Sequence, residues 1–189
     1  MPGEIDWSPV VQSLAATNWT AVLVALVSAF AALVGPVRLW KKQMKKESES
    51  VKASLFAEVA ALVEIVERRK YVQSLRAYEE LLRAQLASPY SAFHKDQGSK
   101  RFEVHLDSQF NRVYQGNVSK LGVLTAEDAK QIVRFHQLAD SVRLDVMPGG
   151  FLAKGTENPE AFKETAELLE MALDIGRALT ASEPKSSRK

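Results

Sequence analysis

The sequence predicts a mostly α-helical protein with one N-terminal transmembrane helix, a long helical stalk and a small cytoplasmic helical bundle. Thr20–Val37 is a run of 18 residues without a charge. At about 1.5 Å of helical rise per residue, such a run nearly crosses a hydrocarbon core of ~30 Å. No Gly or Pro interrupts residues 41–88, where apolar residues recur at helical spacing. Further helix starts follow at Thr125 and Asn158.

The predicted transmembrane helix covers residues 19–40. Trp19 and Trp40 stand at its ends, where indole rings favour the headgroup layer. Residues 1–37 carry a formal charge of −2, and the next nine residues carry +5. Basic residues stay on the cytoplasmic side, so we expect a single-pass protein of the inner (plasma) membrane with its N-terminus outside and its C-terminal domain in the cytoplasm. A cleaved signal peptide would need a basic segment before the apolar run, which is missing. The basic residues, which we also expect near anionic lipid headgroups, are Arg38, Lys41, Lys42, Lys45 and Lys46.

Small residues recur on one face of this helix. Such a stripe lets two membrane helices approach closely and predicts self-association into a homo-oligomer. The alternative is that alanine is simply common in membrane spans, and the sequence leaves both readings open. The stripe consists of Ala21, Ala25, Ala29 and Ala32.

Composition and motifs argue against several classes of function. Residues 47–189 sum to −1, which argues against nucleic-acid binding. The chain has no Cys, and its histidines lack the spacing of a metal site. No catalytic motif or phosphate-binding loop occurs. We therefore expect no catalytic residue, no metal and no cofactor. Three glutamates on the stalk are expected to form a solvated face: Glu58, Glu64 and Glu67.

The rest of the chain divides into segments. Residues 1–18 form a short extracytoplasmic segment, and residues 182–189 a disordered tail. Residues 41–88 form the juxtamembrane stalk, in which one apolar stripe ends at Val66 and a displaced one begins at Val72. A continuous coiled coil would keep its register there, so the stripes favour packing into a bundle. Residues 89–181 form the helical domain.

Local patterns divide the helical domain further. Apolar and polar residues alternate over 101–106, which indicates a short β-strand, with a helix as the alternative. A helix is predicted over 107–121, ended by Gly122 at C′. A second begins at the Thr125 cap and runs to about Val146. A third runs from the Asn158 cap to about residue 180, with Gly176 predicted at a close helix contact.

Asn117 is the least ordinary residue of the helix 107–121, because it continues the apolar row of Tyr114. A buried amide must find hydrogen-bond partners. It either bonds to its own helix or a neighbouring helix, or it contacts a ligand or partner protein in a groove. Asn111 and His136 are the further partner-binding candidates. For His136, a satisfied, half-buried histidine is the expected structural role.

The run Tyr114-Gln-Gly-Asn117-Val-Ser-Lys-Leu121-Gly122-Val-Leu124-Thr125, followed by Val133-Arg134-Phe135, resembles a segment of small bacterial membrane-anchored proteins. Those proteins also have one N-terminal span and a helical cytoplasmic region. Thr125 stands where many of them have Pro, and either residue can begin a helix. The group is uncharacterised, so the resemblance implies a bacterial setting and no activity.

These observations predict a membrane-tethered, non-enzymatic interaction or scaffold module. Its expected partners are the lipid bilayer, an unidentified protein and other copies of the chain, and no nucleic acid. Partner contact would use the Tyr114 and Asn117 region, the loop 89–100 or the outer face of the stalk. The alternative is a membrane effector of the stress or phage-defence type, whose self-assembly perturbs the bilayer.

Overall fold

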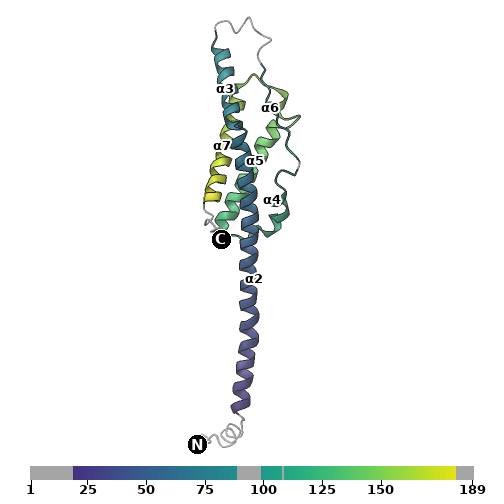
Figure 1. Ribbon diagram of the computed structural model, residues 1–189, viewed down its shortest axis with the longest axis vertical. Helices are drawn as coiled ribbons and strands as arrows, with labels where there is room; N and C mark the ends of the chain where they lie inside the picture. The colour runs from purple at the N-terminus through teal and green to yellow at the C-terminus, as the bar shows by residue number, and fades with distance from the viewer. Residues whose placement is uncertain (1–18, 89–98, 108, 182–189) are drawn as a thin grey trace, which may run out of the picture. The chain divides into compact units, whose positions relative to one another are not determined.

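The computed structural model describes residues 19–88, 99–107 and 109–181, and for residue 19 and residues 31–35 it describes the backbone alone. The described chain is mostly α-helical (Figure 1). It divides into two compact units, Met1–Lys46 and Glu47–Lys189. The expected extracytoplasmic segment 1–18, most of the loop 89–100 and the tail 182–189 lie outside the described residues.

The first unit contains the beginning of α2 (Trp19–Arg68). Large apolar side chains are exposed along it, from Leu23 at 60% to Phe30 at 69%. Trp40 and the five basic residues of 38–46 are exposed as well. Within the part of the chain that the structure describes, no helix combines the length and hydropathy that a membrane span requires. The side chains of Trp19 and Ala32 lie outside the described part.

The second unit begins at Glu47, so residues 47–88, expected as part of a stalk, belong to the same compact unit as the helical domain. The reason is the apolar row of α2, which is fully buried at Leu55, Phe56 and Val59. These side chains pack against α5 (Ala126–Val146) and α7 (Pro159–Ala181). Burying one such side chain stabilises a fold by about 1.5–3 kcal/mol, so α2 is an integral wall of the bundle.

A break separates α2 from α3 (Tyr71–Ala87). Lys70 lies between them in the left-handed conformation, with φ 55° and ψ 38°. The sequence predicts one long helix over 41–87, straight or bent, and the break falls where its two apolar stripes are displaced from each other. Beyond it, Leu75 and Leu82 face a second core cluster that includes Phe162 of α7, and α3 lies beside α7 (Figure 1).

The expected strand at 101–106 does not form. The described residues 99–107 form neither a strand nor a helix and make only an isolated antiparallel bridge, between Lys100 and Thr156. Their other backbone bonds reach helix ends: Phe102 N–H donates to Leu152 O and Val104 N–H to Val146 O. Val104 is buried, as the alternation of apolar and polar residues predicts. The alternation here reflects a segment that lies over helices and not a strand in a sheet.

The α-helix before α5 is shorter than the sequence predicts, and a 3₁₀ helix follows it. The helix expected from 107 begins only at Arg112, as α4 (Arg112–Asn117), and then tightens into η3 (Val118–Val123). Gly122 therefore lies within a 3₁₀ turn and not at a C′ position. The predicted cap of α5 is confirmed, since Asp128 N–H donates to Thr125 Oγ1 over 3.1 Å.

A short helix, α6 (Phe151–Lys154), links α5 to α7. The predicted start of α7 is confirmed, because Glu160 N–H donates to Asn158 Oδ1 and Pro159 is the first helical residue. Gly176 is buried in α7, and a Cβ built on it would lie 2.5 Å from Val63 Cγ2 of α2. The close helix contact expected at this glycine is thus confirmed.

Candidate functional site

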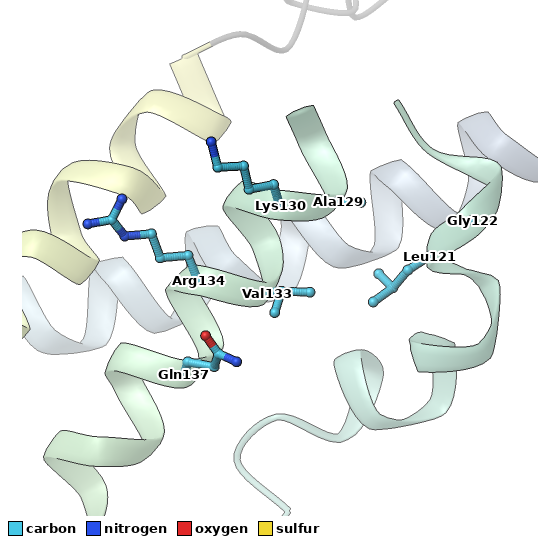
Figure 2. Close-up of a pocket in the computed structure, with 7 residues that line it drawn as sticks. All are labelled: Leu121, Gly122, Ala129, Lys130, Val133, Arg134 and Gln137. Atoms are coloured by element: carbon cyan, nitrogen blue, oxygen red, sulfur yellow. The ribbon is translucent and has the colours of Figure 1, made fainter. Parts of the chain in front are cut away.

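An open groove of about 600 Å³ lies between η3 and α5. It follows α5 over about 12 Å, from Ala129 to Gln137, at 1.5 Å per residue. In Figure 2 the side chains of Leu121 and Val133 point toward one another across the groove. The lining residues are Leu121, Gly122, Ala129, Lys130, Val133, Arg134 and Gln137.

The helical period of α5 gives the groove its two kinds of surface. Ala129 and Val133 are one turn apart and form an apolar floor, while Lys130 and Arg134 form a parallel basic row. Both cations are exposed, and Figure 2 shows them extending away from Leu121. An apolar floor beside basic side chains suits an acidic, amphipathic ligand.

Two ion pairs hold the walls of the groove against α2. Lys52 Nζ lies 2.8 Å from Asp128 Oδ2, at the start of α5. Partial burial acts to raise the pKa of Asp128, but the Lys52 ammonium and the Thr125 hydroxyl bind the charged carboxylate and together hold that pKa below its ordinary value. Lys120 of η3 lies 3.6 Å from Glu47 Oε1. Both pairs connect α2 to residues beside the groove.

Glu58 of α2 caps α4, the helix that directly precedes η3. Its carboxylate accepts hydrogen bonds from Val113 N–H at 2.7 Å and Tyr114 N–H at 2.8 Å. These amides belong to the first turn of α4, where backbone N–H groups lack partners within the helix and the helix dipole favours a negative charge. The Glu58 side chain is only 9% exposed. The expectation that it belongs to a solvated face is therefore wrong. Glu64 and Glu67 do lie in exposed positions, paired with Arg68 and Arg177.

His136 is buried against the same cap. Its ring stacks on Tyr114, with centroids 4.0 Å apart and an interplanar angle of 16°. Within the described chain neither ring nitrogen has a hydrogen-bond partner, and the 3.8 Å from Nε2 to Glu58 Oε2 exceeds hydrogen-bond length. Burial lowers the pKa of His136 from 6.5 to about 4. The expected half-buried, satisfied histidine is instead fully buried, neutral and stacked.

The structure brings together only some of the predicted partner-binding residues. Tyr114 and His136 are in contact, but as internal packing. Asn117 is half-buried, and its Nδ2 donates to Val113 O over 2.8 Å, one turn back in its own helix. Asn111 is buried at the start of α4, where it makes no side-chain cap bond. The geometry favours a structural role for Asn117.

The groove itself was missed by the sequence reasoning. Its signal was present in the row Lys130, Arg134 and Gln137, which follows i, i+4, i+7 spacing beside Val133. The missing information was the position of η3, which supplies Leu121 as the facing wall. Among the residues that the structure describes, no group of three or more His, Asp or Glu side chains could hold a metal ion.

Comparison with known protein families, curated proteins and solved structures finds no match to this chain. The resemblance of Tyr114–Thr125 to membrane-anchored bacterial proteins therefore stays a prediction.

Proposed function

We propose that this chain is a membrane-tethered, non-enzymatic interaction module whose helical bundle captures a protein partner at the cytoplasmic surface of the inner membrane. The groove between η3 and α5 carries the partner-binding part of this proposal. The exposed apolar side chains of α2 carry the tethering part. Holding a partner at the membrane raises its effective concentration there without any new contact.

The exposed apolar side chains at the start of α2 support a membrane anchor. Successive residues on a helix are about 100° apart, so Leu23, Val24, Leu26 and Val27, each at least 60% exposed, cover about half of the circumference of α2. Small uncharged residues that are also exposed cover the other half: Ala21, Ala25, Ser28 and Ala29. A groove of a partner protein would cover one side only, whereas lipid covers all of them. The uncharged run in the sequence extends to Val37 and includes residues 31–35, whose side chains lie outside the described part.

The charge pattern supports a cytoplasmic bundle. Five basic residues follow the apolar run within nine positions, and none precedes it. This asymmetry favours an external N-terminus.

The chemistry of the groove favours an acidic, amphipathic protein segment as the occupant. Lys130 and Arg134 offer two cations one turn apart, Ala129 and Val133 offer an apolar floor, and Leu121 offers the facing apolar wall. A helix with a row of acidic residues beside a row of apolar ones would complement both surfaces. Anionic lipid headgroups would use the cations but not the floor.

Topology is tested by single cysteines, which the cysteine-free chain allows without background labelling. Ser8→Cys and Ala178→Cys are expressed in a bacterial cell and treated with a membrane-impermeant maleimide. We expect Ser8→Cys to react in spheroplasts with an intact inner membrane, and Ala178→Cys, exposed on α7, to react only after lysis. Labelling of Ala178→Cys in intact spheroplasts would overturn the proposed orientation.

Partner capture is tested by photo-crosslinking of the full chain in its native membrane. A photoreactive amino acid at Gln137 samples the groove, and the same amino acid at Glu167, exposed on α7 and outside the groove lining, is the control. We expect one defined protein adduct from position 137 only. Mass spectrometry identifies its peptide, which we expect to be acidic and amphipathic.

Charge reversal makes the test specific. Lys130→Glu with Arg134→Glu should abolish the adduct, whereas Arg69→Glu with Lys154→Glu, an equal charge change at exposed positions outside the groove lining, should keep it. Adducts to lipid alone, or to other copies of the chain alone, would contradict the proposal. Self-adducts together with toxicity that depends on Ala21, Ala25 and Ala29 would favour the membrane effector.

A further inference from the structure

A second cavity lies inside the bundle, separate from the groove. It has a volume of about 200 Å³ and is enclosed by α2, α3, α5, α7 and the segment 99–107. Its lining side chains are aliphatic or aromatic with one exception, Arg143 of α5. Protein interiors hold few voids larger than a water molecule, so an apolar space of this size is unusual.

The lining of the cavity combines exposed and buried side chains. Ile65 is 47% exposed and the Arg143 side chain is 21% exposed, so these two lining residues reach the surface. Leu75 and Val146, both buried, line the interior. Along α5 the lining extends from Ala139 to Val146, which is about 10 Å at 1.5 Å per residue. This length suits a chain better than a single ring.

The volume sets the size of the occupant. An engineered apolar cavity of about 150 Å³ stays dry and binds benzene. A natural cavity of about 200 Å³ can therefore take a somewhat longer apolar group, comparable to the tail of octanoate. It is too small for the two chains of a phospholipid.

Arg143 supplies a binding group for an acidic head. Its Nε lies 2.7 Å from Asp140 Oδ1, and its guanidinium carbon lies 5.4 Å from the centre of the Phe110 ring. Its Nη1 also donates to Met147 Sδ over 2.7 Å. These contacts hold the guanidinium beside Phe110 in the lining of the cavity. A guanidinium has five N–H donors and can bind two carboxylates at once, so the bonds to Asp140 and Met147 leave donors for a second carboxylate.

We propose that this cavity binds the apolar tail of a single-chain, medium-length fatty acid, with the carboxylate held by Arg143. The inference is independent of the membrane topology and of the groove, because it rests only on residues that enclose the cavity.

The test uses the full chain in lipid nanodiscs and octanoate carrying a diazirine near the end of its tail. After photolysis, mass spectrometry maps the labelled peptides. We expect adducts on the cavity lining, from α3, α5 or the segment 99–107, and their loss with excess unlabelled octanoate. Ala139→Leu fills the cavity and should reduce this labelling about tenfold or more. Ala178→Leu makes the same change on the exposed face of α7 and should leave the labelling unchanged.

The head group is tested with Arg143→Gln and with the matching octanol probe. We expect the variant to lose labelling by the acid and to keep labelling by the alcohol. Labelling confined to residues 19–40, or labelling that unlabelled octanoate does not compete away, would overturn the proposal. If Ala139→Leu raises the melting temperature while the wild type shows no competable labelling, the cavity is only a void. Competition in the wild type decides the question even where a variant fails to fold.

Discussion

The carboxylate of Glu58, on α2, accepts a hydrogen bond over 2.8 Å from the backbone N–H of Tyr114, in the first turn of α4. A second bond, from Val113 N–H, ends on the other carboxylate oxygen. Through these bonds, a side chain 56 positions earlier in the sequence fixes where α4 starts. The packing of η3, and with it one wall of the groove, depends on that start.

Replacing this carboxylate should therefore loosen α4. Hydrogen bonds to a charged group contribute about 1.5–3 kcal/mol, and the two amides would lose their acceptor. We expect Glu58→Ala to lower the free energy of unfolding by about 2–3 kcal/mol. Glu58→Gln, which keeps one acceptor oxygen, should cost less. Denaturant unfolding measures the free energy, and hydrogen exchange at Val113 and Tyr114 reports the local loss.

Glu64→Ala is the matched control. Its side chain is 65% exposed and its partner Arg68 is one turn away, an arrangement that contributes little. We expect a change below about 0.5 kcal/mol. Equal effects at positions 58 and 64 would show that the Glu58 cap contributes nothing.

Replacing Gly176 by even the smallest larger residue, alanine, should destabilise the bundle. A methyl group there would lie 2.5 Å from Val63 Cγ2 and 3.0 Å from Phe135 Cε2. Alanine gains up to about 1 kcal/mol of helix propensity over glycine, but overpacking of a core costs about 1–3 kcal/mol. We expect Gly176→Ala to lower stability overall, measured as a lower melting temperature.

Gly116→Ala is the comparison at an open position. No atom lies within 4 Å of the methyl group it would add, and Gly116 lies within α4. We expect it to leave stability unchanged or raise it by up to about 1 kcal/mol. If Gly176→Ala raised the stability, α2, α5 and α7 would be packed more loosely around Gly176 than the distances to Val63 and Phe135 indicate.

The helices that rest on local signals could be predicted from the sequence. Thr125 and Asn158 cap helices because their side-chain oxygens reach amides two or three residues ahead, so neighbours in the sequence suffice. The break at Lys70 could not be placed in this way, because a lysine carries no preference for the left-handed conformation. Only the displaced apolar stripes indicated it.

The candidate site was predictable only in part, because distant residues build it. Glu58 resembles any exposed glutamate until α4 is folded over it. For Asn117 the sequence leaves a structural and a contact role open, and only the fold shows the bond to Val113 O within its own helix. The segment 101–106 has the alternation of a strand, yet its backbone partners Val146 and Leu152 belong to helices.

Arg76 joins α3 to α7 and should matter more than other surface cations. It holds Glu170 through two nitrogens, at 2.8 and 3.2 Å, and Glu79 at 3.0 Å. Hydrogen bonds to Glu170, then to Glu79, raise the pKa of Arg76. We expect Arg76→Ala to cost about 1–2 kcal/mol in denaturant unfolding, because Glu79, which is 8% exposed, loses one of its cations.

Arg68→Ala tests whether that cost depends on burial. Arg68 is 78% exposed and, within the described residues, pairs with Glu64 alone, so we expect a loss below about 0.5 kcal/mol that vanishes in high salt. If both arginines behave alike, the network of Arg76 is an ordinary surface interaction.

Burial of His136 should make the bundle sensitive to mild acid. In the unfolded chain this imidazole binds a proton once the pH falls below its ordinary pKa of 6.5. In the folded protein it binds a proton only near pH 4. Between these values the unfolded state holds more protons, so stability falls as the pH falls. The difference between the two pKa values corresponds to about 3 kcal/mol, present in full above pH 6.5 and lost by pH 4.

Burial also raises the pKa of Asp145, so this carboxyl contributes to the pH dependence as well, and the Glu58 carboxylate faces the His136 ring over 3.8 Å. The test is therefore a difference between variants. His136→Phe keeps a ring against Tyr114 and cannot be protonated, so its stability should decline less steeply from pH 6.5 to 4 than that of the wild type. His105→Gln changes a histidine that is 82% exposed and should decline as the wild type does. Parallel curves for the wild type and His136→Phe would contradict this prediction. They would mean that the imidazole is protonated equally in the folded and unfolded chains despite its burial beside Tyr114.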